Sequence, residues 1–231
     1  MIINLKDIPI YWINLEKDKE KREFQETQFL EYGLDKNYRI DGVEFIRKAY
    51  LSQLITLYKI RKKLPALILE DDVVVIKEHF KYNIEVPDDI DALYLGHSIW
   101  GLPKEGETYP ACYDEPPYVR PGVSTQKSLG ATVHTNYNDT LVRTHNMLST
   151  HAILYVSEDY VNYFISKLEK YIFKTHIDVV AAAIQNDFKV LTPKDPYFYQ
   201  KDFHNVDGYN IEYYTLNPKV NNGKINIKDK F

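Results

Sequence analysis

The sequence has little cysteine, no excess of positive charge and no long apolar run, and each absence excludes a class of protein. A single cysteine, Cys112, leaves no internal disulfide and no multi-cysteine zinc site among the 231 residues. The net charge is −4 and no basic block alternates with aromatic residues, so we expect no nucleic-acid partner. No apolar run approaches the roughly 20 residues that cross a bilayer, so no transmembrane segment is predicted.

What is present is typical of a globular protein, with 44% hydrophobic and 27% charged residues. The first residues lack a basic stretch followed by an apolar core, so we expect no secretory signal. Together with the single cysteine, this predicts a cytoplasmic protein. Tyrosine, lysine, asparagine and isoleucine are plentiful, a composition that also suits a viral protein in the host cytoplasm or the virion.

The most informative stretch is LPALILEDDVVVI, residues 64–76. Its segment 66–69 is short and apolar and follows a proline, which is typical of a buried strand. Glu70, Asp71 and Asp72 come next, and repulsion and lost solvation raise the pKa of such carboxyls unless a cation or donors compensate. In an extended chain Glu70 and Asp72 point to one side and Asp71 to the other.

Two carboxylates on one side can bind Mg²⁺ or Mn²⁺, which prefer oxygen ligands. The alternative is an acidic turn whose side chains lie in water. Apolar residues on both sides of the acids favour a crevice over an exposed tip.

The apolar periodicity predicts alternating strands and helices, as in an α/β sheet with mostly parallel neighbours. Ligands of such sheets bind beyond the carboxyl ends of the strands, so we expect Leu15, the three acids and Gly96 at one edge. The expected strands are 8–15, 38–40, 66–69, 91–96, 152–156 and 189–192, and the expected helices are 17–32, 44–63, 76–83, 157–171 and 178–186.

Two segments depart from this alternation. Residues 97–149 are rich in Pro, Gly, Thr, Tyr and His, and we expect a long loop or insert over the site, with a short hairpin. Residues 206–231 are rich in Asn and Lys, and we expect a C-terminal arm that either wraps the domain or is partly disordered.

The order of several segments resembles glycosyltransferase family 25, which includes bacterial lipooligosaccharide galactosyltransferases and collagen galactosyltransferases. The most specific segment is ILEDD at 68–72. The resemblance covers roughly residues 8–205, but the family's Gly-Cys and Ser-His pairs are not matched at 48–53, where only Ser52 remains. The matching segments are 13–17 with Lys21-Arg22, Asp41-Gly42, 67–73, 91–96, 150–157, and Asp178 followed by Pro196 and Gln200.

This resemblance implies a Rossmann-like GT-A fold with one catalytic domain at residues 1–205. It also implies a metal-dependent transferase that uses Mn²⁺ or Mg²⁺. The donor substrate would be a nucleotide sugar, UDP-linked, and the acceptor a hydroxyl of a glycan or protein. The hexose would be transferred with inversion at its anomeric carbon.

The resemblance also assigns expected roles to residues. Asp72 and Glu70 are expected to bind the metal, and His204 is either a third ligand or an ordinary exposed histidine. Asp178 is expected to be the base that deprotonates the acceptor, and its alternative role is a helix N-cap.

The remaining candidate residues are expected around the donor and the acceptor. His151 is either in contact with a substrate or a buried structural histidine, and Gln200 is expected near the donor or acceptor. The residues expected to bind the donor nucleotide are Asn14, Leu15, Lys17, Asp71 and Gly96.

Two other functions stay open. The unmatched segment 48–53 motivates a non-catalytic module that binds a glycan or protein and has kept the fold. A metal-dependent nucleotidyl or phosphoryl transferase would use the same acids, although the sequence has no glycine-rich phosphate loop.

Overall fold

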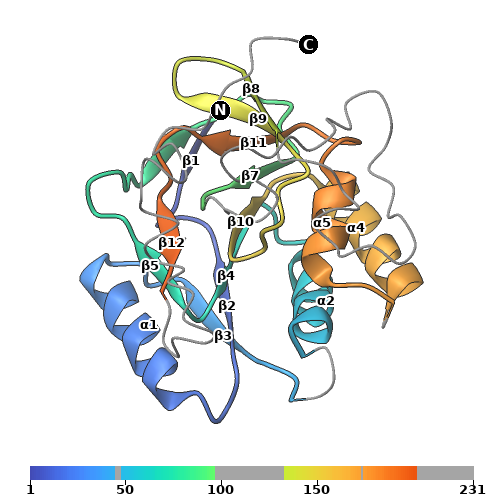
Figure 1. Ribbon diagram of the computed structural model, residues 1–231. Helices are drawn as coiled ribbons and strands as arrows, with labels where there is room; N and C mark the ends of the chain where they lie inside the picture. The colour runs from blue at the N-terminus through green and yellow to red at the C-terminus, as the bar shows by residue number, and fades with distance from the viewer. Residues whose placement is uncertain (45–47, 97–132, 173, 202–231) are drawn as a thin grey trace, which may run out of the picture.

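The structure is a computed structural model that describes residues 1–44, 48–96, 133–172 and 174–201 (Figure 1). Helices and strands alternate between residues 10 and 70, as the periodicity predicts, whereas the rest of the described chain contains successive strands and a pair of successive helices. Their bounds are β1 Ile2–Asn4, β2 Ile10–Asn14, α1 Lys19–Glu31, β3 Asn37–Asp41, α2 Lys48–Ile60, β4 Ala66–Glu70, β5 Val73–Val75, β6 Asn83–Glu85, β7 Ala92–Tyr94, β8 Val133–Asn136, β9 Leu141–His145, β10 Ala152–Tyr155, α4 Glu158–Tyr171, α5 Ile177–Ile184, β11 Val190–Pro193 and β12 Phe198–Gln200.

An eight-stranded sheet in the order β3-β2-β4-β10-β7-β11-β9-β8 forms the centre of the fold. The pairs β2–β3, β2–β4 and β7–β11 are parallel, whereas the other four pairs are antiparallel. The fold is therefore mixed α/β, and the expectation of a mostly parallel sheet is wrong. The reason is that an apolar run such as β10 predicts a strand buried on both faces but not the direction in which it runs.

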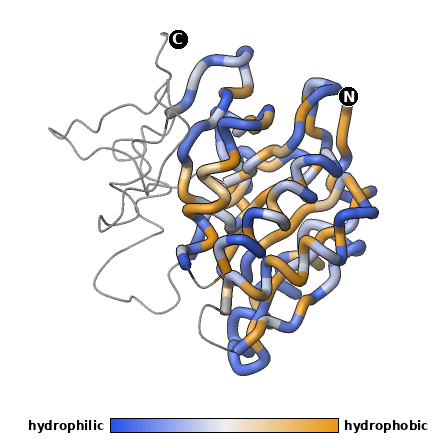
Figure 2. The backbone as a smooth tube through the Cα atoms, turned by 90° about the vertical axis from the view of Figure 1, so that its right-hand side faces the viewer, coloured by the Kyte–Doolittle hydropathy of each residue, from blue (hydrophilic) through white to orange (hydrophobic). Residues whose placement is uncertain are grey.

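The sheet is covered on both faces. Along β4, Ala66 and Ile68 face the hydrophobic cluster formed with α2, α4 and α5, whereas Leu67 and Leu69 face the cluster formed with α1 and the ribbons β1–β6 and β5–β12. Figure 1 shows α1 on one side of the sheet and α2, α4 and α5 on the opposite side. Figure 2 shows hydrophilic segments in the outer loops. The continuous apolar sequence of β4 follows from burial of both its faces.

The helix expected at 76–83 is wrong. Turns occupy 77–79, and β6 then pairs antiparallel with β1, so that Ile84 lies opposite Ile3. Both isoleucines are buried in the cluster on the α1 side of the sheet. Pairing with Ile3, which lies 81 residues earlier in the sequence, stabilises this conformation. The apolar periodicity within the segment does not reveal such a distant partner.

The stretch expected as a loop over the site is described only in its last part. Residues 97–132 lie outside the described residues, as does the C-terminal arm at 206–231. β8 and β9 form the expected hairpin, and it extends the sheet beyond β11, at the end remote from β2 and β4. In the described ranges, none of the helices combines the length and apolar character needed to cross a bilayer.

Helix α4 begins where its sequence predicts. The Ser157 hydroxyl accepts a hydrogen bond from the Tyr160 N–H at 3.0 Å, and Glu158 and Asp159 lie in the first turn. Both features stabilise a helix N-terminus.

We expect Ser157→Ala to lower the free energy of unfolding by about 1 kcal/mol, because the Tyr160 N–H loses its acceptor. Ser157→Asp keeps an acceptor there and should stay close to the wild type. Urea denaturation followed by circular dichroism measures both variants. Equal losses in the two variants would contradict a capping role.

Candidate active site

The carboxyl ends of β2, β4 and β7 meet at one edge of the sheet. β2 and β4 are parallel, and β10, which lies antiparallel between β4 and β7, starts at the edge where both of them end. The Glu70 N–H donates to the His151 carbonyl at 2.9 Å, which joins the end of β4 to the start of β10. The prediction that Leu15, the three acids and Gly96 share one edge is confirmed.

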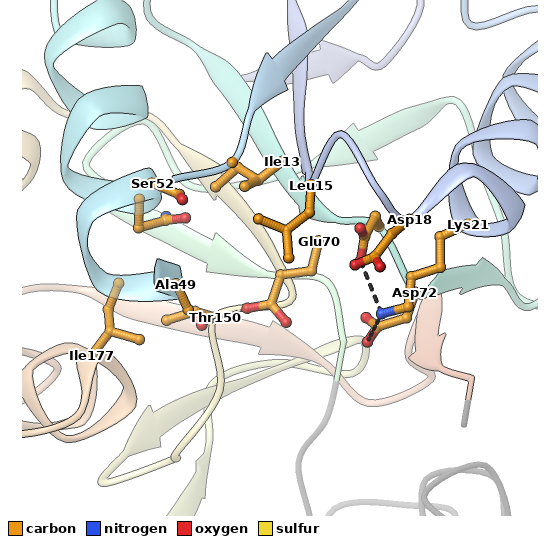
Figure 3. Close-up of a pocket in the computed structure, with 13 residues that line it drawn as sticks. Ile13, Leu15, Asp18, Lys21, Ala49, Ser52, Glu70, Asp72, Thr150 and Ile177 are labelled. Carbon is orange, nitrogen blue, oxygen red and sulfur yellow. Dashed lines mark hydrogen bonds and ion pairs between the residues drawn. The ribbon is translucent and has the colours of Figure 1, made fainter. Parts of the chain in front are cut away.

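A cavity of about 230 Å³ opens at this edge (Figure 3). One half is lined by charged groups and the other by small or apolar side chains. Figure 3 shows Glu70 between Thr150 on one side and Asp72 on the other. The lining residues are Ile13, Leu15, Asp18, Lys21, Gly42, Ala49, Ser52, Gln53, Glu70, Asp71, Asp72, Thr150 and Ile177.

Glu70 and Asp72 share a neighbour, the side-chain amide of Gln200 on β12. This amide lies 3.1 Å from Glu70 Oε2 and 3.5 Å from Asp72 Oδ1. The second carboxylate oxygen of Glu70 accepts from the Thr150 hydroxyl at 2.7 Å, and this hydroxyl lies 3.0 Å from Asp178 Oδ1. Each carboxylate oxygen of Glu70 thus accepts a hydrogen bond from a different part of the fold, one from β12 and one from the segment before β10.

Asp71 is held by different groups. It accepts from the Asn14 amide at 2.8 Å and from the Lys21 ammonium at 3.1 Å. Lys21 also lies 3.4 Å from Asp72, and the side chains of Lys21 and Asp71 are only 14% and 12% exposed. Lys21 is therefore a buried counter-ion shared by two of the three acids.

Burial shifts Glu70, Asp72 and Asp178 toward their neutral forms. Burial raises the pKa of Glu70 to about 8, with further contributions from Asp72 and Asp178. Burial also raises the pKa of Asp72, and the nearby Lys21 ammonium opposes this shift. Burial raises the pKa of Asp178 in the same way, and the hydrogen bond from Thr150 opposes it. Burial lowers the pKa of Lys21, but Asp72 and Asp71 outweigh it and raise the pKa overall. Such a site favours an additional positive charge.

The donor atoms at this edge suit Mn²⁺ or Mg²⁺. In the described ranges no group of three or more His, Cys, Asp or Glu side chains is arranged to hold a metal ion. Glu70 and Asp72 nevertheless offer two carboxylates, and a 180° turn of the Gln200 amide presents a third oxygen. Hard divalent cations prefer oxygen donors of this kind and complete their shell with water. His204, the expected third ligand, lies outside the described residues.

A polar stripe on α1 fixes the turn that carries the acids. Gln25 donates to the Val73 carbonyl at 2.5 Å, and Gln28 donates to the same carbonyl at 3.1 Å. Gln28 also accepts from the Val75 N–H at 2.8 Å. Both glutamines are buried, and they satisfy backbone groups that the short strand β5 leaves unpaired on this side.

Asn14 lies at the centre of a hydrogen-bonded network and is 1% exposed. Its amide donates to Asp71 and to the Asp18 carbonyl, and its oxygen accepts from Arg22 and Arg39. These bonds use its full capacity, and Asn14 does not line the cavity. The structure therefore brings Asn14 to the acids, where it positions Asp71.

The other residues expected at the donor are placed differently. Leu15 lines the cavity and follows β2 directly. Lys17 is exposed and forms an ion pair with Glu44 at 2.5 Å, away from the cavity lining.

Gly96 and His151 form a close packing contact. A Cβ added at Gly96 would lie 1.8 Å from His151 Nε2, so glycine is the residue that leaves room for the imidazole. His151 is 1% exposed, and its Nδ1 lies 2.6 Å from the Ser149 hydroxyl. Neither residue lines the cavity, and the contact accounts for both without a ligand.

Lys21 and Thr150 have no role predicted from the sequence, although both lie within the matching segments. The signal for Lys21 is its place on one helix face with Asp18, Gln25 and Gln28, at spacings of three and four residues. For Thr150 the sequence offers no such signal, because the contact depends on the antiparallel direction of β10.

We expect Gly96→Ala to destabilise the protein, because the new methyl group overlaps the His151 ring. Removing the ring as well, in Gly96→Ala/His151→Ala, should cost less than the sum of the two single variants. Thermal denaturation of the four proteins measures this coupling. Additive losses would contradict the packing contact.

The pKa of Glu70 makes stability depend on pH. The folded protein keeps a proton on Glu70 up to about pH 8, whereas the unfolded chain loses it near the ordinary value of 4.5. The unfolded state therefore binds fewer protons between these values, and stability falls as the pH rises through this window.

Without divalent ions, Glu70→Gln should remove much of that fall and be more stable than the wild type at pH 9, by on the order of a few kcal/mol. Glu85→Gln, at an exposed site on β6, is the matched control and should behave as the wild type. Urea denaturation between pH 5 and 9 measures the three proteins. Parallel curves for wild type and Glu70→Gln would contradict the raised pKa.

Comparisons with known proteins identify no family for this chain. Neither models of protein families nor curated proteins gave a match. Among solved structures, the CTP:phosphocholine cytidylyltransferase LicC from Streptococcus pneumoniae matches with a TM-score of 0.40 and 10% sequence identity, covering 84% of this chain and 92% of that chain. A similarity of this size supports no statement about function, and membership of glycosyltransferase family 25 stays a prediction.

Proposed function

We propose that this protein is a glycosyltransferase of the family 25 type with a GT-A fold. It would transfer a hexose from a UDP-linked sugar to a hydroxyl of a glycan or protein, with inversion and with Mn²⁺ or Mg²⁺. The observation that carries the proposal is that Glu70 and Asp72 line one cavity at the carboxyl edge of the sheet and share the Gln200 amide as a neighbour.

In this proposal Glu70 and Asp72 hold the divalent ion, and Gln200 adjusts to it. A bound divalent ion stabilises the negative charge of a departing diphosphate. Lys21 is the one cationic side chain among the described residues that line the cavity, so its ammonium, ion-paired with Asp71 and Asp72, would lie beside the same phosphates. Asn14 holds Asp71 in place and contributes indirectly.

The nucleoside would lie in the other half of the cavity. Leu15 and Gly42 follow β2 and β3, and Ala49, Ser52 and Gln53 come from α2. Small side chains leave room for a flat ring, and the Gln53 amide offers polar atoms. Asp178 is the base that takes the acceptor proton, and burial raises the pKa of its carboxyl, which makes it a stronger base.

A non-catalytic binding module with this fold is the second candidate. The observation that favours it is the ion pairing of Lys21 with Asp71 and Asp72, which compensates two of the acids without any metal. Such a module would bind a glycan or a protein and leave nucleotide sugars intact.

A panel of UDP- and GDP-sugars distinguishes the two candidates. With Mn²⁺, we expect the wild type to hydrolyse at least one donor slowly, since water replaces the acceptor. UDP with Mn²⁺ should raise the melting temperature, because a ligand at about 100 times its Kd stabilises the folded state by about 2.7 kcal/mol. Asp72→Ala should lose both effects.

Asp35→Ala, at an exposed position between α1 and β3, is the control and should keep both effects. Hydrolysis of no donor together with retained glycan binding would contradict the enzyme and favour the module. Hydrolysis that survives in Asp72→Ala would contradict the assigned metal residue.

A further inference from the structure

The cavity reaches Thr150 and not Asp178. Thr150 lines the cavity, although its residue as a whole is only 4% exposed. Asp178, at the start of α5, is not among the described residues that line it, whereas the neighbouring Ile177 is. The Thr150 hydroxyl lies 3.0 Å from Asp178 Oδ1, so within the described part of the chain it connects the cavity with this carboxylate.

We propose that Thr150 is a catalytic residue that relays the acceptor proton from the cavity to Asp178. This inference rests on the proposed glycosyl transfer, in which a base must take a proton from the acceptor hydroxyl. It changes how the base works, because Asp178 acts through Thr150 and not by direct contact with the acceptor.

The step balances as two coupled proton transfers. The acceptor oxygen bonds to the anomeric carbon while its O–H bond breaks, and the proton passes to Thr150 Oγ1. The proton already on Thr150 Oγ1 passes at the same time to Asp178 Oδ1. The nucleoside diphosphate leaves with the electron pair of the broken glycosidic bond, and Asp178 later returns its proton to solvent.

The hydrogen-bonding capacity of a hydroxyl suits this role. Thr150 has one proton and two lone pairs, so when it donates to Asp178 its oxygen can accept from a substrate. Its position is fixed by the two residues that follow it, because Ala152 pairs with Leu69 in the sheet and the His151 carbonyl accepts from the Glu70 N–H. A relay group needs such fixed geometry to remain within hydrogen-bond reach of both partners.

Glu70 is the other carboxylate in contact with this hydroxyl, at 2.7 Å. In the proposed enzyme Glu70 is engaged with the divalent ion, which leaves Asp178 as the carboxylate that accepts the proton. The comparison of Asp178→Asn with the Thr150 variants tests this choice directly.

Variants at position 150 that differ in size and in the presence of a hydroxyl distinguish a relay from a structural role. Thr150→Val keeps the shape and removes the hydroxyl, whereas Thr150→Ala also leaves space in which a water can replace it. A relay predicts that kcat falls at least about 100-fold in Thr150→Val, falls less in Thr150→Ala and stays within about threefold in Thr150→Ser. A purely structural role predicts the opposite order for Val and Ala.

Kinetics with the nucleotide sugar that the wild type hydrolyses fastest, and melting with UDP and Mn²⁺, give the two readouts. We expect the UDP-dependent melting shift to persist in all Thr150 variants. Thr150→Val/Asp178→Asn should lose no more activity than Asp178→Asn alone, because the two residues act as one unit. Thr144→Val, a buried hydroxyl paired with Thr192 at 2.6 Å elsewhere in the sheet, is the control and should retain activity.

The outcomes separate this proposal from the function on which it rests. Turnover by the wild type with unchanged kcat in Thr150→Val, or with additive losses in the double variant, would overturn the relay alone. Lower activity in Thr150→Ala than in Thr150→Val would assign Thr150 a structural role. No turnover by the wild type with any donor would overturn the glycosyl transfer and the relay together.

Discussion

The burial of several carboxylates at one edge of the sheet is the constraint on which the site depends. Charged carboxylates repel one another and lose solvation there, so each needs a donor or counter-ion from a neighbouring element. Lys21 comes from α1, Asn14 from β2, Thr150 from the start of β10 and Gln200 from β12. The acids are tolerated because these elements converge, and the convergence places a cavity beside them.

The antiparallel strand β10 makes this convergence possible. A parallel strand between β4 and β7 would end at this edge. β10 begins here instead. Thr150, which precedes the strand by two residues, lies against Glu70. The same strand places the His151 ring against Gly96. One reversal of direction therefore supplies both a polar contact and a packing contact to the site.

Local sequence predicts the elements of this fold better than their pairing. The strand β4 and the Ser157 cap of α4 depend on residues that are adjacent in the sequence, and both predictions are confirmed. The strand β6 depends on pairing of Ile84 with Ile3, and the direction of β10 depends on its neighbours in the sheet, so periodicity misses both. The same limit applies to the site: the three acids stand together in the sequence, whereas the contacts of Lys21 and Thr150 exist only after folding.

The acids differ in how completely the folded chain satisfies them, and the difference indicates where a ligand would act. Both carboxylate oxygens of Asp71 have close partners, Asn14 at 2.8 Å and Lys21 at 3.1 Å. Among the residues that the structure describes, the side chain of Asp72 has only long contacts, 3.4 Å to Lys21 and 3.5 Å to Gln200, and burial raises its pKa. A chain selected for stability alone would replace such an acid or pair it fully. Asp72 thus gains more than Asp71 from a cation brought by a ligand, because the partners of Asp71 already hold it in the folded chain.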